Sequence, residues 1–124
     1  MKETTILLVE ENAVLLQLYR AILIKYGYKV IAVSDGISAI KALQSKYIPA
    51  VVITNYRLLD ISGLSITRHI RSDRRIQNIP VVMICTDYTI ENEALASGVN
   101  AFFAKPISFN NLNNYINKLL YKNA

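Results

Sequence analysis

Several short apolar runs in this sequence lead directly into polar side chains that could share one site. Two adjacent carboxylates follow the first run, an amide follows the third, a thiol ends the fourth and an amine follows the fifth. Crowded carboxylates raise each other's cost of ionisation, so they need a nearby cation. Either the lysine neutralises one glutamate while the other faces solvent, or both glutamates share the lysine or a hard divalent metal such as Mg²⁺. The candidate site residues are Glu10, Glu11, Asn55, Cys85 and Lys105, with Glu10 and Glu11 as candidate metal ligands.

The spacing of the apolar residues predicts the elements that must position these side chains. Short runs unbroken by charge are typical of strands covered on both faces, and apolar residues three or four apart are typical of helices. Gly27 and Gly98 are expected to end two helices, and Ser34 or Asp35 to begin another. Strands are predicted at 4–9, 29–33, 49–54, 81–85 and 101–104, a loop at 55–62, and helices at 12–26, 35–44, 63–74, 89–97 and from 108 onward.

The apolar positions also predict which side of each helix is buried. The expected inward residues are Val14, Leu15, Leu18, Ile22 and Leu23 in the first helix, Ile37, Ile40 and Leu43 in the second, and Leu112, Ile116, Leu119 and Leu120 in the last. His69 is expected to be exposed, because its neighbour Ile70 takes the core direction. Thr86 is expected to point away from Cys85 if the fourth strand continues.

The alternation of strands and helices predicts the α/β class. Such chains form a parallel sheet between two helical layers, with right-handed crossovers. Functional sites in these sheets lie outside the carboxyl ends of the strands. The candidate site residues are therefore expected to converge on one edge of the sheet.

Length and composition restrict the possible classes of protein. The 124 residues fit one domain, so residues 1–124 are predicted to form a single unit. One cysteine and one histidine exclude an internal disulfide and a zinc framework, and they favour the cytoplasm. The apolar stretches are too short to span a bilayer, so no membrane partner is expected.

The chain carries a formal charge of +5, most of it scattered. The one dense cluster comprises Arg68, Arg71, Arg74 and Arg75. Arginines near a helix C-terminus suit the helix dipole, so a solvated helix end explains the cluster. A partner-docking or nucleic-acid patch is the alternative, although no aromatic platform is interleaved with these arginines.

Five segments in order along the chain resemble the receiver domains of bacterial response regulators, of the chemotaxis-receiver type. The resemblance covers essentially the whole chain and implies a flavodoxin-like, three-layer fold with five helices and strand order 2-1-3-4-5. It also implies a signalling role rather than an enzymatic one. The matching segments are ILLVEEN (6–12), AVVITNYRL (50–58), SGL (62–64), PVVMIC (80–85) and GVNAFFAKP (98–106).

The resemblance implies a role for each matching position. In the family, an aspartate after the third strand accepts a phosphoryl group from a histidine kinase, and two acidic residues after the first strand help to hold Mg²⁺. A Thr or Ser after the fourth strand and a lysine before a proline bind the phosphoryl group. An aromatic residue in the fifth strand changes rotamer. The corresponding positions here are Asn55, Glu10, Glu11, Cys85, Lys105 with Pro106, and Phe102.

This chain departs from the family pattern at the acceptor. Asn55 has no anionic oxygen to attack phosphorus, and the Cys85 thiol is only a weak donor. The side chains of Glu10 and Glu11 are each one methylene longer than aspartate, which disturbs octahedral Mg²⁺ geometry. Together, Glu10, Glu11, Asn55 and Lys105 carry a net charge of −1, so the pocket could rest without a bound metal ion.

The sequence therefore predicts a degenerate pseudo-receiver that needs no cofactor, or at most binds Mg²⁺ weakly. It would act by binding proteins such as a histidine kinase, an effector domain or another signalling protein, through the surface around the last two helices and the fifth strand. Two alternatives stay open. The chain could be a working, Mg²⁺-binding phosphoacceptor that uses another residue, with Asp60 considered and expected to face solvent, or it could be a basic regulatory domain associated with nucleic acid.

Overall fold

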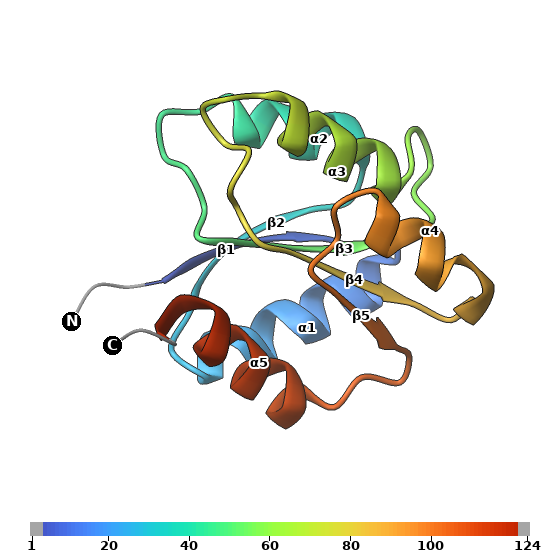
Figure 1. Cartoon of the computed structure of the whole chain (residues 1–124). Coiled ribbons are helices and arrows are strands. Elements are labelled where there is room, and N and C mark those ends of the chain that lie inside the picture. The colour runs from blue at the N-terminus through green and yellow to red at the C-terminus, as the bar shows by residue number, and fades with distance from the viewer. Residues whose placement is uncertain (1–3, 122–124) are drawn as a thin grey trace.

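The computed structural model describes residues 4–121 and places all five strands in one parallel sheet between helices (Figure 1). The strand order is β2-β1-β3-β4-β5, as predicted, and α1 and α5 lie on the opposite face of the sheet from α2, α3 and α4. In chain order the elements are β1 (Thr5–Val9), α1 (Ala13–Lys25), β2 (Lys29–Val33), α2 (Gly36–Leu43), β3 (Val51–Asn55), α3 (Gly63–Ser72), β4 (Val81–Cys85), the 3₁₀ helix η1 (Tyr88–Ile90), α4 (Glu91–Ala96), β5 (Ala101–Ala104) and α5 (Phe109–Tyr121). The flavodoxin-like fold is confirmed.

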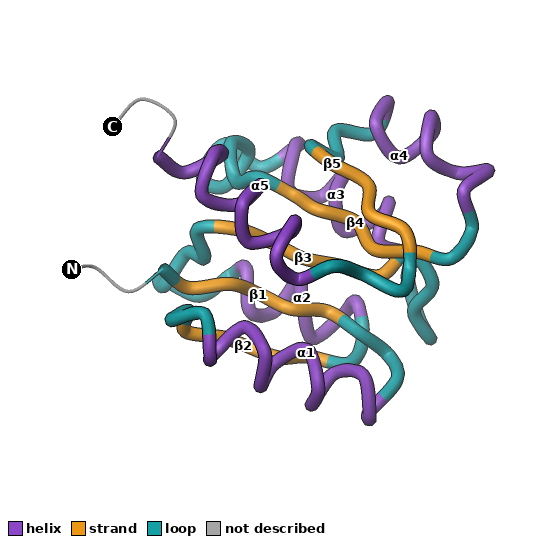
Figure 2. Tube along the Cα trace, turned by 90° about the horizontal axis from the view of Figure 1, so that it is seen from below, coloured by secondary structure: helices purple, strands orange, loops and turns teal. Residues whose placement is uncertain are grey.

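The central strands bury both of their faces, which explains why their sequences are continuously apolar. In β1, Leu7 and Val9 pack into the core beneath α2 and α3, while Ile6 and Leu8 pack into the core beneath α1 and α5. Figure 2 shows α1 and α5 lying across the same face of the sheet. Because strand side chains alternate between faces, one short run supplies both cores.

The strand register brings the carboxyl ends of the central strands to one edge. Val9 pairs with Thr54, Thr54 pairs with Met83, and Cys85 pairs with Ala104. The residues that follow these positions therefore meet at the same edge, which lies at the right of Figure 1 near the α4 end of the sheet.

Side-chain caps begin most helices where the sequence predicted. Asn12 and Ser62 accept hydrogen bonds from backbone N–H groups at the starts of α1 and α3, and Asp35, rather than Ser34, caps α2. Two boundaries differ from expectation. Asn55 is the last residue of β3 rather than the first of the loop, and the predicted helix 89–97 begins as the 3₁₀ turn η1 before α4.

The predicted inward faces of α1 and α2 are partly wrong. In α1 the buried residues are Leu16, Tyr19 and Leu23, whereas Val14 is 76% exposed and Leu18 is 50% exposed. In α2, Ile37 is exposed. The residues of α1 are apolar on both sides of the helix, so helical spacing alone does not identify the side that meets the sheet.

Among residues 4–121, no helix is both long and apolar enough to cross a bilayer.

Candidate functional site

A cavity of about 220 Å³ lies at the carboxyl edge of the sheet. The structure places all five candidate site residues in its lining, although they come from β1, β3, β4 and β5 or from the residues that follow them. The lining residues are Glu10, Glu11, Asn12, Leu15, Asn55, Arg57, Cys85, Thr86 and Lys105.

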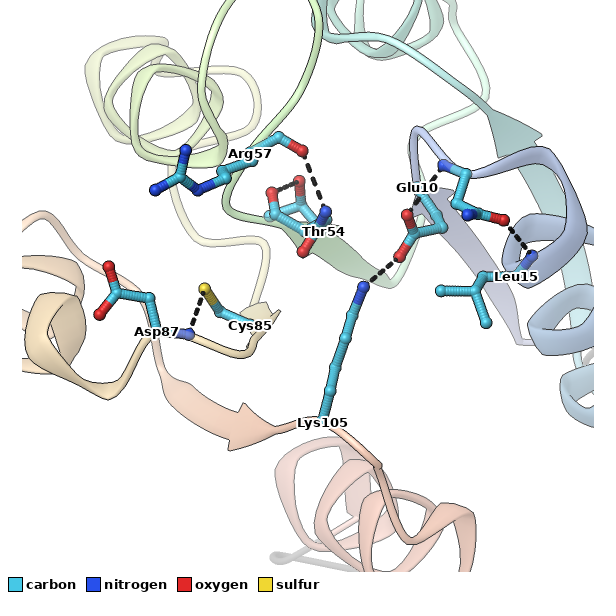
Figure 3. A network of polar contacts seen from close by, with 9 residues as sticks. Glu10, Leu15, Thr54, Arg57, Cys85, Asp87 and Lys105 are labelled. Atoms are coloured by element: carbon cyan, nitrogen blue, oxygen red, sulfur yellow. Dashed lines mark hydrogen bonds and ion pairs between the residues drawn. The ribbon is translucent and has the colours of Figure 1, made fainter.

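A buried ion pair joins the first and fifth strands across this cavity (Figure 3). The Lys105 Nζ lies 2.8 Å from Glu10 Oε1, and only 3% of the Glu10 side chain and 16% of the Lys105 side chain are exposed. The second oxygen, Glu10 Oε2, accepts the backbone N–H of Asn12 at 3.0 Å. Both carboxylate oxygens of Glu10 are therefore engaged within the protein.

Asn55 ends β3 at the floor of the cavity. Its Nδ2 donates a hydrogen bond of 2.9 Å to the backbone carbonyl of Arg57. Gly63 opens α3 against the backbone of Asn55, and a Cβ at position 63 would lie 2.4 Å from the Asn55 carbonyl oxygen. Glycine is required there because β3 and α3 approach so closely.

Arg57 is a lining residue that the sequence reasoning missed. Its side chain is exposed, and in Figure 3 its guanidinium points away from Glu10. Counting Arg57 makes the formal charge of the lining zero rather than −1, but its guanidinium lies on the side away from Glu10. The available signal was its place two residues after Asn55, within the loop at the carboxyl edge.

Cys85 is buried at the end of β4, and its Sγ accepts the backbone N–H of Asp87 at 3.2 Å. Thr86 is exposed and lines the same cavity as Cys85. Thr86 was expected to point away from Cys85 only if the strand continued, and β4 ends at Cys85.

The model of the response regulator receiver domain family matches residues 6–117. The chain belongs to this family. The receiver domain is 27% identical over 107 residues to the polar-differentiation response regulator DivK of Brucella ovis, which covers 84% of this chain and 85% of that protein. It is thus a receiver-type signalling domain of two-component systems, in which receivers interact with kinases and effectors.

Solved structures match the fold closely. The receiver domain of a sensor histidine kinase from Pseudomonas aeruginosa PAO1, solved with a magnesium ion coordinated in its active site cleft, is 28% identical and has a TM-score of 0.86. That match covers 94% of this chain and 97% of the other. A response regulator from Chloroflexus aurantiacus has a TM-score of 0.89 at 22% identity, covering 96% and 98% of the two chains, and supports the fold alone.

The side chains of this receiver fit Mg²⁺ poorly. Mg²⁺ prefers carboxylate oxygens in near-ideal octahedral geometry. Glu10 is committed to Lys105 and to the backbone, Asn55 offers only a neutral amide oxygen, and Glu11 is the one remaining carboxylate in the lining. Within residues 4–121 no group of three or more His, Cys, Asp or Glu side chains is arranged to hold a metal ion.

Phe102 and Pro106 occupy the positions that the sequence assigned either to the family's switch or to simple packing. Phe102 lies half-buried in β5 and packs against the core beneath α3 and α4. Pro106 follows Lys105 and is exposed. The backbone N–H of Lys105 donates to the Cys85 carbonyl at 3.1 Å, so the end of β5 stays joined to the end of β4.

Asp60 is exposed, as expected, but its carboxylate is not free. Its two oxygens accept the N–H groups of Gly36 and Ile37, each at 2.8 Å, and Oδ1 also accepts the N–H of Ile61 at 2.7 Å. These bonds, with the one from Ile37 contributing most, lower the pKa of Asp60. Asp60 therefore ties the loop after β3 to the start of α2.

The predicted solvated helix end holds for part of the arginine cluster, because Arg68, Arg74 and Arg75 are exposed whereas Arg71 is half-buried. Arg71 donates hydrogen bonds to the carbonyls of Gly98, Gln77 and Ile79 and to Asn100 Oδ1. Arg75 bonds the carbonyls of Leu43 and Ser45. Arg68 pairs with Glu93 at 3.8 Å. The helix-dipole explanation did not anticipate that Arg71 and Arg75 fold back onto carbonyl groups of neighbouring segments.

His69 is half-buried rather than exposed. Its Nε2 is buried and has no hydrogen-bond partner among the described residues.

Proposed function

We propose that this receiver domain is a pseudo-receiver, which signals without phosphorylation at residue 55 and acts by binding proteins rather than as an enzyme. The observation that carries the proposal is Asn55 at the end of β3, with its Nδ2 bonded to the Arg57 carbonyl. A carboxamide lacks the anionic oxygen that forms an acyl phosphate.

The charges around Asn55 support a pocket that is complete without a metal. The Lys105 ammonium is bonded to Glu10, and Arg57 supplies a second cation to the lining. A dication that took Glu10 as a ligand would have to displace Lys105 from it. We therefore infer that the resting pocket holds no Mg²⁺.

The partner we infer is another signalling protein, such as a histidine kinase or an effector domain, bound near α4, β5 and α5. Nucleic acid is disfavoured, because Arg71 and Arg75 are bonded to backbone carbonyls and Arg68 is paired with Glu93. The cytoplasmic location and the single-domain boundary at 1–124 stay predictions.

Incubation with acetyl phosphate and Mg²⁺, followed by intact mass spectrometry, tests the loss of the acceptor. We expect the mass of the protein to stay unchanged. The gain of one phosphoryl group would contradict the proposal, and peptide mapping would then locate the acceptor.

Affinity capture with the folded domain tests constitutive binding. The wild type, Asn55→Asp and the control Asn78→Asp, which adds the same charge on an exposed loop, are compared with and without acetyl phosphate. We expect the same partners from all three. A partner that only Asn55→Asp gains or loses on phosphorylation would show that binding still depends on this position.

A further inference from the structure

A second cavity, of about 490 Å³, lies at the amino edge of the sheet, opposite the Glu10–Lys105 pair. We call it the Tyr/Asn cavity. It is formed by the start of β1, the turn between α1 and β2, and the C-terminal half of α5. Its lining residues are Thr4, Tyr26, Gly27, Tyr28, Asn113, Asn117 and Tyr121.

Two local structures bring the aromatic and amide side chains together. Gly27 adopts φ +98°, a left-handed conformation that turns the chain sharply between Tyr26 and Tyr28, and a Cβ there would meet no atom within 4 Å. On α5, Asn113, Asn117 and Tyr121 are spaced four residues apart and share one side of the helix.

Among residues 4–121, none of the lining side chains is charged at neutral pH. The Tyr28 phenol is buried, and this burial raises its pKa, so the hydroxyl stays protonated. A charged ligand would lose hydration without meeting an opposite charge in this lining. The cavity therefore favours a neutral ligand.

The hydrogen bonds within the lining leave donors available. The Tyr28 hydroxyl donates to Asn113 Oδ1, and the Tyr26 hydroxyl donates at 3.3 Å to Oδ1 of Asn110, which lies outside the lining. The hydroxyls of Thr4 and Tyr121 bond each other at 3.0 Å. Among residues 4–121, the side-chain N–H groups of Asn113 and Asn117 have no protein acceptor, so they are free to donate to water or to a ligand.

We propose that the Tyr/Asn cavity binds a neutral, flat heteroaromatic ligand with hydrogen-bond acceptors on its edge, the class that includes nucleobases and pteridines. Tyrosine rings stack on such ligands, and the two asparagine amides donate to carbonyl or ring-nitrogen acceptors. The cavity volume lies within the range of small-molecule sites. The inference is independent of residue 55 and of the pseudo-receiver proposal.

Caffeine is the probe, because it is flat, uncharged and has hydrogen-bond acceptors but no donors. Titration into the ¹⁵N-labelled full chain is followed by NMR. We expect saturable shifts of the Asn113 and Asn117 side-chain amides and of the backbone around Tyr28, with a Kd of the order of 1 mM for so small a ligand. Indole is flat but has a hydrogen-bond donor and no carbonyl. We expect its Kd to be at least about five-fold higher than that of caffeine.

Two variants of α5 make the test specific. Asn117→Ala should weaken caffeine binding by about five-fold, the effect of one lost hydrogen bond. Asn114→Ala makes the same change at an exposed position of α5 outside the lining, and it should leave the Kd unchanged. No saturable shifts at these amides, equal binding of indole and caffeine, or equal Kd values for Asn117→Ala and wild type would each overturn the proposal.

Discussion

The two edges of the sheet are built from different chemistry. At the carboxyl edge, Glu10 and Lys105 form an ion pair that is largely withdrawn from water. At the amino edge, Tyr26, Tyr28 and Tyr121 meet uncharged asparagines, and neutral hydrogen bonds hold the lining together. Removing one member of a buried ion pair strands a charge, whereas removing one neutral hydroxyl loses a modest bond. The comparison implies that the domain depends on its carboxyl edge for stability even though an asparagine occupies position 55 there.

Lys105→Met should have the largest effect, because it leaves the Glu10 carboxylate buried without its cation. We expect the free energy of unfolding, measured by urea titration, to fall by about 3 kcal/mol. Lys118→Met, at an exposed position of α5, is the matched control and should change stability by less than about 0.5 kcal/mol. Adding Glu10→Gln to Lys105→Met should recover part of the loss. Equal stabilities of Lys105→Met and the control would remove the distinction between the two edges.

Tyr28→Phe tests the amino edge and should have a smaller effect. It keeps the ring and removes only the hydroxyl that donates to Asn113. The expected loss in the same urea titration is about 1 kcal/mol. Tyr47→Phe, at a ring that is 71% exposed, serves as the control and should be neutral. A loss as large as that of Lys105→Met would mean that the amino edge contributes as much to the free energy of unfolding as the carboxyl edge.

Asp60→Asn addresses the loop beside the carboxyl edge and should have the smallest effect. Hydrogen bonds from Ile37, Gly36 and Ile61 lower the pKa of Asp60 below 3.8. A carboxyl with a lowered folded-state pKa stabilises the fold above its unfolded-state pKa, and this contribution is lost as the pH falls through the folded value. The wild type should therefore be more stable than Asp60→Asn at pH 6, and the difference should shrink below about pH 4. A difference that is constant from pH 6 to pH 2 would speak against this role.

The fold followed from the sequence because its signals were local and strong. The apolar runs at 6–9, 51–54 and 81–85 have no charge to interrupt them, and they became the buried centre of the sheet. The helix faces were harder to predict where the signal was ambiguous. In α1, Val14 and Leu18 are as apolar as Leu16 and Leu23, and only contact with the sheet decides between the two sides.

The site followed from the sequence only in part. Because strand ends meet at one edge, Glu10, Asn55, Cys85 and Lys105 could be grouped before any coordinates. Thr86 could also be assigned to this edge, but Arg57 could not, because it lies two residues beyond β3, where loop conformation rather than strand alternation directs the side chain. The hydrogen bonds of Arg71 could not be predicted either, since its partners Gly98 and Asn100 lie far along the chain.

The Arg71 guanidinium has a consequence for how this domain would meet a partner. It bonds carbonyls on the loop before β4 and on the turn before β5, so two connections next to α4 are braced by one side chain of α3. A surface held rigid before it meets its partner loses little conformational entropy on docking. Under the pseudo-receiver proposal, a partner that docks near α4 and β5 would meet loop ends that Arg71 already holds in place.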